Sequence, residues 1–434
     1  METTINETLR KRIEGRVRQT LSELHVQKYI GVRADAASLR ALDDEKEGVL
    51  KSLSKPQLET INSALGTLPM WSLVIAMVDE ATKEQLAERE SDEAVPLKEL
   101  LSGAAIEGLA RSISDTLADL PRPYVFSFCL TGRFTSAYRD ASMNPVRQDR
   151  VVLEGSWQRG KASVPIAYAP NRQANPAAGG TKLSSFLTNA EPANSSVLEP
   201  AERVYLHLAA DGFVAGEEPG ETTAVAKQTL RSFVGLCWAL KILRKSWAPP
   251  GLHVRTAIHQ RRDDGAFSLV GSAHLTGREA KAIDELRLPP AHEMSPSDVA
   301  EQLNNLARLF SVPEIGTHIK LAGKWLFDYF TEDDAAMRVM HVAIATEVLL
   351  GSTGGEEGIT KTLATRLAYL IAGSNSERTE LEGEFKVLYQ MRSKVVHNGH
   401  QRLSRKEYMS LRRFGELAGR VVSAEIRLSL ADIA

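Results

Sequence analysis

The chain has 434 residues, 43% of them hydrophobic and 25% charged, and a formal net charge of −2 at pH 7. Such a composition is typical of a soluble globular protein, and the length favours two or three domains. The only cysteines, Cys129 and Cys237, are too isolated for a disulfide framework or a cysteine-based metal site, so we expect both in the core. No apolar run approaches the ~18 residues of a membrane span and no signal segment is visible, so we expect a cytoplasmic protein without a membrane partner.

The sequence predicts a multidomain α+β protein with three regions. Residues 1–120 read as mostly helical, with patterned segments near 5–24, 55–65 and 97–117. An acidic stretch from Asp79 to Glu93 interrupts them and is expected to be an exposed helix end and loop.

Residues 121–292 change to short β-rich runs around one helix, 222–243. The predicted strands are 124–130, 151–157, 163–168, 203–208, 253–259 and 266–270. This order predicts a central α+β domain with a largely antiparallel sheet. A long loop is expected over 168–197; its Gly179-Gly180-Thr181-Lys182 lacks the first glycine of a nucleotide-binding P-loop.

Residues 293–434 are predicted to form an all-helical antiparallel bundle. Its expected helices are 298–309, 316–330, 334–350, 359–371, 380–396 and 404–427. The last one begins at a capping box, in which Ser404 and Glu407 satisfy each other's backbone N–H groups.

The most informative stretch of the chain runs from Arg392 to His397. Arg392 falls among the apolar residues expected to form the buried face of helix 380–396, where an unpaired charge is costly. Those residues are Leu381, Phe385, Leu388, Tyr389 and Val396. An acidic partner, a two-fold-related copy of the helix or a bound phosphate would each compensate the charge.

His397 lies in the last turn of the same helix, before Asn398-Gly399, residue types at which helices end. A favourable interaction with the negative end of the helix dipole is a sufficient structural reason for a histidine there. On a straight helix, Arg392 and His397 point about 140° apart, so a flexible Arg side chain or a second subunit must bring them to one point.

The string from Leu388 to Gly399, LYQMRSKVVHNG, resembles the signature of HEPN domains of the Apea-like group. The preceding segments 359–368 and 343–350 are similar to the helices that precede that signature in the group. The resemblance covers the C-terminal region alone. It implies a helical, usually dimeric domain, in which Arg392 and His397 match the catalytic residues of metal-independent endoribonucleases.

Two further residues inside this motif, Ser393 and Asn398, are expected to support the site. They differ from the commoner choices of the family, which are Asn, Asp or His at the first position and Gly at the second. Glu347 is a third supporting candidate, because it interrupts a nearly all-apolar helix. We expect it to orient Arg392; the alternative is a solvated carboxylate at the edge of the helix.

Basic residues are concentrated beside the motif. Between Lys386 and Arg427 there are ten lysines and arginines against three glutamates, a local charge of +7. Such a patch suits phosphate contacts, although a solvated helix face gives the same pattern. The expected RNA contacts are Lys394, Arg366, Arg402, Arg405 and Lys406.

The resemblance therefore implies a ribonuclease effector of a prokaryotic defence or toxin system that needs neither a metal nor another cofactor. It has no H-E-x-x-H motif, carboxylate triplet or Cys/His cluster that would indicate a metal. Its partners would be RNA and a second copy of the chain, with one His397 acting as base and the other as acid. The region before the HEPN-like domain would sense an unidentified trigger. The alternative is a catalytically silent scaffold that binds RNA or protein.

Overall fold

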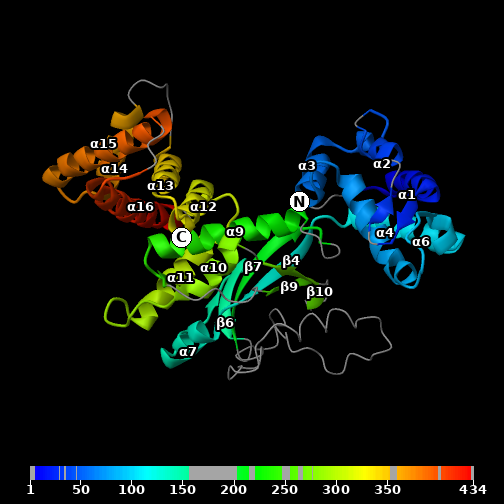
Figure 1. Cartoon of the computed structure of the whole chain (residues 1–434), viewed down its shortest axis with the longest axis horizontal. Coiled ribbons are helices and arrows are strands. Elements are labelled where there is room, and N and C mark those ends of the chain that lie inside the picture. The colour runs from blue at the N-terminus through cyan, green and yellow to red at the C-terminus, as the bar shows by residue number, and fades with distance from the viewer. Residues whose placement is uncertain are drawn as a thin grey trace.

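The protein is a mixed α+β protein with a helical C-terminal region (Figure 1). The computed structural model describes residues 5–28, 30–33, 36–44, 46–155, 203–214, 220–246, 255–261, 267–275, 277–351, 359–398 and 402–431. The predicted strand 163–168, the predicted loop 168–197, Gly399 and His400 lie outside these residues.

The N-terminal helices surround a hydrophobic core of their own, which runs from Ile13 to Leu120. They are α1 (Glu7–Glu23), α2 (Ala36–Asp43), α3 (Lys55–Leu65), α4 (Pro69–Ala87), α5 (Leu97–Leu100) and α6 (Gly103–Ala118). The predicted helix 97–117 is divided, because Ser102 caps a new helix with its side chain. Among the described residues no single helix is long and apolar enough to cross a membrane; α3 and α4 meet that test only as a pair bent by 46°.

A small sheet that the sequence did not reveal accompanies these helices. Its order is β2-β1-β3, with β1 at His25–Gln27, β2 at Gly31–Arg33 and β3 at Val95–Pro96. Strands of two or three residues are too short to show an alternating pattern, which explains why they were missed.

The central sheet has six strands in the order β10-β9-β4-β7-β6-β5, and every neighbouring pair is antiparallel. The strands are β4 (Arg122–Cys129), β5 (Val146–Arg147), β6 (Val151–Gly155), β7 (Val204–Gly212), β9 (Arg255–Arg261) and β10 (Phe267–His274). Helix α9 (Glu221–Ala239) lies along one face of it (Figure 1). Phe126, Leu206 and Leu208 from that sheet share a core with Phe233 of the helix.

Several short elements lie beside this sheet or beside α9: α7 (Gly132–Asp140), which contacts β7, and α10 (Gly277–Glu285) with the paired strands β8 (Arg244–Lys245) and β11 (Leu286–Arg287). The two cysteines lie in this part of the chain. Cys237 is fully buried, and burial raises the pKa of its thiol, whereas Cys129 is only partly buried.

All six predicted C-terminal helices are present: α11 (Pro296–Ser311), α12 (Thr317–Thr331), α13 (Ala335–Leu350), α14 (Ile359–Ile371), α15 (Asn375–Asn398) and α16 (Arg405–Ala431). Their buried residues belong to the same core as the central sheet, which is continuous from Tyr124 to Ile426. The core therefore has no break at the boundary predicted between residues 292 and 293.

Candidate functional site

The predicted ion pair between Glu347 and Arg392 is present, and it joins α13 to α15. The Glu347 Oε1 atom lies 3.8 Å from Arg392 Nε. The same oxygen accepts a hydrogen bond of 2.7 Å from the hydroxyl of Tyr389. Glu347 is thus bound by two side chains that are one helical turn apart on α15, and it is not simply a solvated carboxylate at a helix edge.

The Arg392 guanidinium is held in place but retains hydrogen-bonding capacity. Its Cζ lies 5.7 Å from the centre of the Tyr389 ring, and its Nε is buried without a hydrogen-bond partner. The side chain as a whole is 30% exposed. No hydrogen bond from it to another described residue is present, so the donors in the exposed part of the guanidinium are available to an anion at the surface.

Arg392 borders the buried face of α15, and the predicted course of that face was wrong at its end. Val396 is 47% exposed, whereas Met391 is buried and Val395 packs against the core. From Leu388 the buried stripe continues through Met391 to Val395, because successive steps of three and four residues turn it around the helix. This leaves Arg392 at the rim of the stripe, where its exposed part can reach a ligand.

Tyr389 is the site residue that sequence reasoning missed, since it was taken only as part of the apolar face. Burial, followed by the hydrogen bond and the negative charge of Glu347, raises the pKa of Tyr389 to about 12. The phenol therefore stays protonated at neutral pH, where it donates to Glu347 and cannot act as a base. The sequence signal that could have revealed this role is the spacing: Tyr389 precedes Arg392 by three residues, so the two side chains are neighbours on one helix.

His397 is exposed in the last turn of α15, and Ser393 is exposed one turn earlier. Asn398 is the final residue of the helix. No hydrogen bond or ring contact joins His397 to Arg392, in keeping with their divergent directions on one helix. A single chain thus supplies the two groups but does not bring them together.

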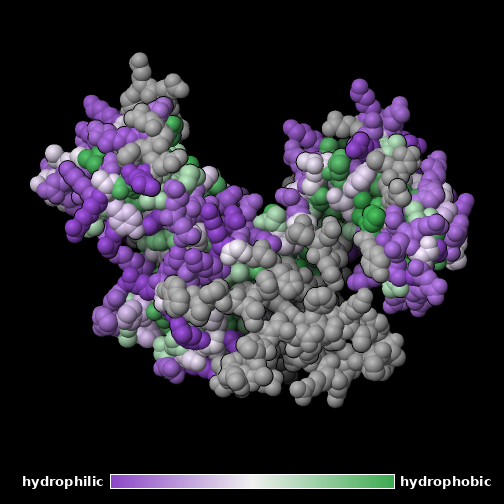
Figure 2. Space-filling model, viewed as in Figure 1, coloured by the Kyte–Doolittle hydropathy of each residue, from purple (hydrophilic) through white to green (hydrophobic). Residues whose placement is uncertain are grey.

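The basic patch is less positive than its sequence window indicates. Four of its ten bases form ion pairs with carboxylates of the described residues: Arg392 with Glu347, Lys394 with Glu407, Arg413 with Glu384 and Glu416, and Arg420 with Glu377. Three of these carboxylates, at 347, 377 and 384, come from outside the window. Figure 2 shows a predominantly hydrophilic surface over the C-terminal helices in this view.

The residues predicted to contact RNA differ in their exposure and in whether they already form ion pairs or hydrogen bonds. Arg402, Arg405 and Lys406 are exposed and form no ion pair with the described carboxylates, so they remain available to phosphates. Lys394 is 55% exposed but lies 3.2 Å from Glu407. Arg366 donates from Nη1 to the carbonyl oxygens of Leu350 and Gly351, at 2.8 and 2.6 Å. It caps the end of α13 and is only partly exposed, a structural role that the sequence did not reveal.

The predicted capping box at the start of α16 is confirmed. The Glu407 Oε2 atom accepts from the backbone N–H and the hydroxyl of Ser404, at 2.9 and 2.8 Å, and Ser404 accepts from the Glu407 N–H. These hydrogen bonds, with a further contribution from Lys394, lower the pKa of Glu407 to about 2. Because Lys394 follows Arg392 closely, the cap connects the end of α15 to the start of α16.

Ser404→Ala is expected to destabilise the protein by about 1 kcal/mol at neutral pH, since it removes an N-terminal cap.

The contribution of Glu407 to stability should depend on pH. The pKa of Glu407 is lower in the folded state, so the stabilisation by its carboxylate is complete above the ordinary pKa of 4.5 and falls as the pH drops towards about 2. The stability difference between wild type and Glu407→Gln should therefore shrink over that interval. Urea unfolding at several pH values would measure it; a difference that is constant down to pH 2.5 would contradict the cap's charge dependence.

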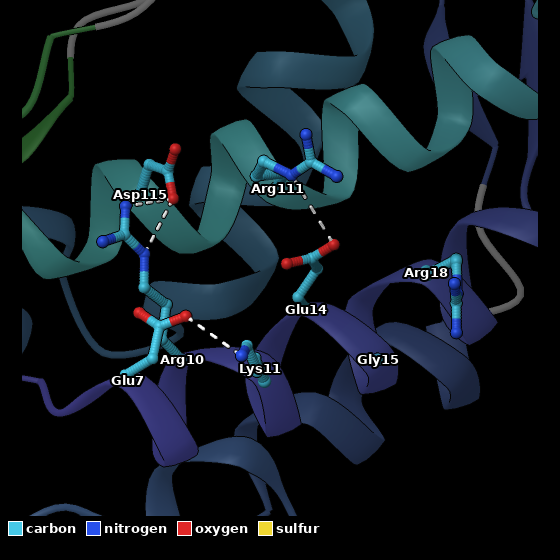
Figure 3. A pocket seen from close by; sticks show the side chains of 8 residues that line it. All are labelled: Glu7, Arg10, Lys11, Glu14, Gly15, Arg18, Arg111 and Asp115. Carbon is cyan, nitrogen blue, oxygen red and sulfur yellow. Dashed lines mark hydrogen bonds and ion pairs between the residues drawn. The ribbon is translucent and has the colours of Figure 1, made fainter.

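A second charged region lies among the N-terminal helices, between α1 and α6 (Figure 3). It is a groove of about 450 Å³, lined by seven charged side chains and Gly15. Arg10 pairs with Asp115, Lys11 with Glu7, Arg111 with Glu14, and Arg18 with Glu107 outside the groove. The charges neutralise one another within the protein, so this groove is a weaker anion site than the end of α15.

His341 is buried, with the centre of its ring 5.9 Å from that of the Trp325 ring, and burial lowers the pKa of its imidazole. In the part of the chain that the structure describes, no group of three or more His, Cys, Asp or Glu side chains could hold a metal ion.

Comparison of the chain with known protein families, with curated proteins and with solved structures finds no match.

Proposed function

We propose that the C-terminal helices form a metal-independent endoribonuclease of the HEPN type. The observation that supports this best is the state of Arg392: Glu347 and Tyr389 hold it at the surface, and no hydrogen bond to another described residue fills its donors. A planar guanidinium with free donors suits two-point binding of a phosphodiester. The resemblance of the sequence to that family is a second support, because the three segments that carry it follow one another as helices α13, α14 and α15.

In the proposed reaction the ribose 2′-oxygen attacks the phosphorus and the bond to the 5′-oxygen breaks. One His397 takes the proton of the 2′-hydroxyl, and the His397 of a second subunit gives a proton to the leaving 5′-oxygen. Arg392 stabilises the negative charge on the phosphoryl oxygens. The products are a 2′,3′-cyclic phosphate and a 5′-hydroxyl.

This chemistry requires a homodimer through the C-terminal helices, because each chain holds one exposed His397 at the end of α15. The exposed Val396 beside it, at 47%, offers apolar area to such an interface. The biological setting that we propose is the cytoplasm of a prokaryote, where the enzyme acts in defence or as a toxin. The N-terminal unit, with its separate core, would respond to the trigger.

The test compares wild type with His397→Ala on labelled total RNA and tRNA in EDTA, together with the size of each protein in solution. Wild type should cleave and leave cyclic phosphate ends, while His397→Ala should be at least about 100-fold slower. His292→Ala is the matched control, since His292 is also exposed. Cleavage that EDTA abolishes, or that His397→Ala retains, would refute the proposal.

A further inference from the structure

Two tyrosines and an arginine meet where α12, α13 and α16 come together, and a second arginine lies close by on α16. The Arg338 guanidinium lies over the Tyr329 ring, 4.8 Å from its centre, and 6.0 Å from the centre of the Tyr408 ring. Arg338 Nη1 also donates to the Tyr408 hydroxyl at 3.4 Å. Arg412 follows Tyr408 by one turn of α16 and is exposed. Burial raises the pKa of Tyr329, and the nearby charges of Arg338 and Arg412 oppose that rise.

Within the part of the chain that the structure describes, the positive charges of this cluster have no carboxylate partner. Neither Arg338 nor Arg412 forms an ion pair with a carboxylate among the described residues, and Arg338 Nε is buried without a hydrogen-bond partner. Arg413, the next residue along, instead pairs with both Glu384 and Glu416. Arg338 and Arg412 are both close enough to Tyr329 for their charges to oppose the rise of its pKa. Two such positive charges repel each other, and a bound anion would relieve that repulsion. A phosphate has the geometry that a guanidinium fork matches.

An aromatic surface lies beside these charges. Tyr408 is 43% exposed and Met409 is 56% exposed. Arg405, one turn earlier on the same helix, is exposed as well. An exposed tyrosine ring beside arginines is a platform on which an unpaired nucleic-acid base stacks, while its phosphate binds the cations. The combination of flat apolar surface and paired positive charge fits a nucleotide better than an inorganic anion.

The cluster is connected to the candidate active site through the start of α16. Glu407, which precedes Tyr408, lies 3.2 Å from Lys394, and Lys394 is two residues beyond Arg392. We infer that Arg338, Arg412 and Tyr408 form a second nucleotide subsite, where Tyr408 stacks an unpaired base and the two arginines hold the adjoining phosphate of the same RNA strand. The assignment of the strand as RNA rests on the proposed function; the binding of a base and phosphate does not.

The experiment measures binding to a fluorescent 2′-O-methyl oligouridine, which cannot be cleaved through its 2′-oxygen. Tyr408→Ala should weaken binding of the full chain about tenfold, whereas Tyr408→Phe, which keeps the ring, should stay within about twofold of wild type. Arg412→Ala should weaken binding about fivefold and lower the slope against log salt concentration by about one. Arg427→Ala is the matched control: Arg427 is exposed on the same helix, about 22 Å further along, and should have no effect.

Thermal unfolding of each variant separates a binding defect from a folding defect, and Arg412→Ala removes an exposed side chain that the core does not need. Equal binding by wild type and Tyr408→Ala, or equal loss with Ala and Phe, would overturn the subsite. Uridine 5′-monophosphate is the second probe: binding of the mononucleotide without binding of the oligonucleotide would overturn the assignment to a strand. Failure of the cleavage test with His397→Ala leaves these binding results unchanged, so the two proposals fail separately.

Discussion

Gly235→Ala is expected to destabilise the protein by about 3 kcal/mol or more, because it places a methyl group where two helix backbones touch. A Cβ at Gly235 of α9 would lie 2.1 Å from the carbonyl oxygen of Gly323 and 2.6 Å from the N atom of Phe327, both on α12. Backbone atoms cannot rotate away as a side chain can. The two helices would have to separate along a buried crossing, and the surrounding core would lose contacts.

Urea unfolding measured by far-UV circular dichroism would show this loss as a lower midpoint. Gly383→Ala is the matched control: Gly383 is also within a helix, yet a Cβ there meets nothing within 4 Å. That variant should be as stable as wild type or more stable by about 0.5 to 1 kcal/mol, since alanine favours helix. Similar midpoints for Gly235→Ala and Gly383→Ala would show that α9 and α12 are not packed this closely.

The α9–α12 crossing also explains why the central sheet and the C-terminal helices share one hydrophobic core. Pattern and composition change near residue 292, but Gly235 and Gly323 bring the two regions into backbone contact. Gly419 of α16 makes a second close approach, 2.4 Å from its Cβ position to the carbonyl of Ala239. We therefore expect the region from Tyr124 to Ile426 to unfold in one transition.

The elements with a long, regular hydrophobic pattern were predictable, and their ends were not. α14 has the predicted bounds, whereas α15 begins at Asn375, five residues before the prediction. Its first turn is polar and buries no apolar side chain, so periodicity could not mark it. Short elements such as α7 depend on contacts with distant strands, which the sequence of one segment does not contain.

The candidate site was predictable where a charge interrupts an apolar stripe. Glu347 and Arg392 each stand out in a hydrophobic helix, and burial cost makes them natural partners. The surface ion pairs were not predictable, because Arg413 and Arg420 find carboxylates on α15 that the local sequence window does not include. The role of Tyr389 was not predictable for the same reason: only the tertiary structure shows that its hydroxyl and Arg392 both lie against Glu347 Oε1.

Arg392→Ala is expected to lower RNA cleavage by about 100- to 1,000-fold, the loss that follows removal of one group that stabilises developing charge. Its effect on stability should be small. The ion pair with Glu347 spans 3.8 Å, carries no hydrogen bond from Arg392 and has side chains 30% and 22% exposed. Ion pairs at or near the surface typically contribute about 0 to 1 kcal/mol. Tyr389 still donates to Glu347 in the variant, so the carboxylate keeps a partner.

The stability of Arg392→Ala distinguishes the nuclease from a silent scaffold in which Arg392 and Glu347 act as a structural pair. A scaffold predicts a large loss of unfolding free energy and no cleavage to lose. The nuclease predicts loss of cleavage in a folded protein, with an intermediate rate for Arg392→Lys, because lysine keeps the charge but cannot make a two-point contact. Arg413→Ala is the control: this arginine is also partly exposed but pairs with Glu384 and Glu416, so cleavage should change less than about twofold. A loss of more than about 2 kcal/mol in Arg392→Ala, with wild type inactive on RNA, would favour the scaffold.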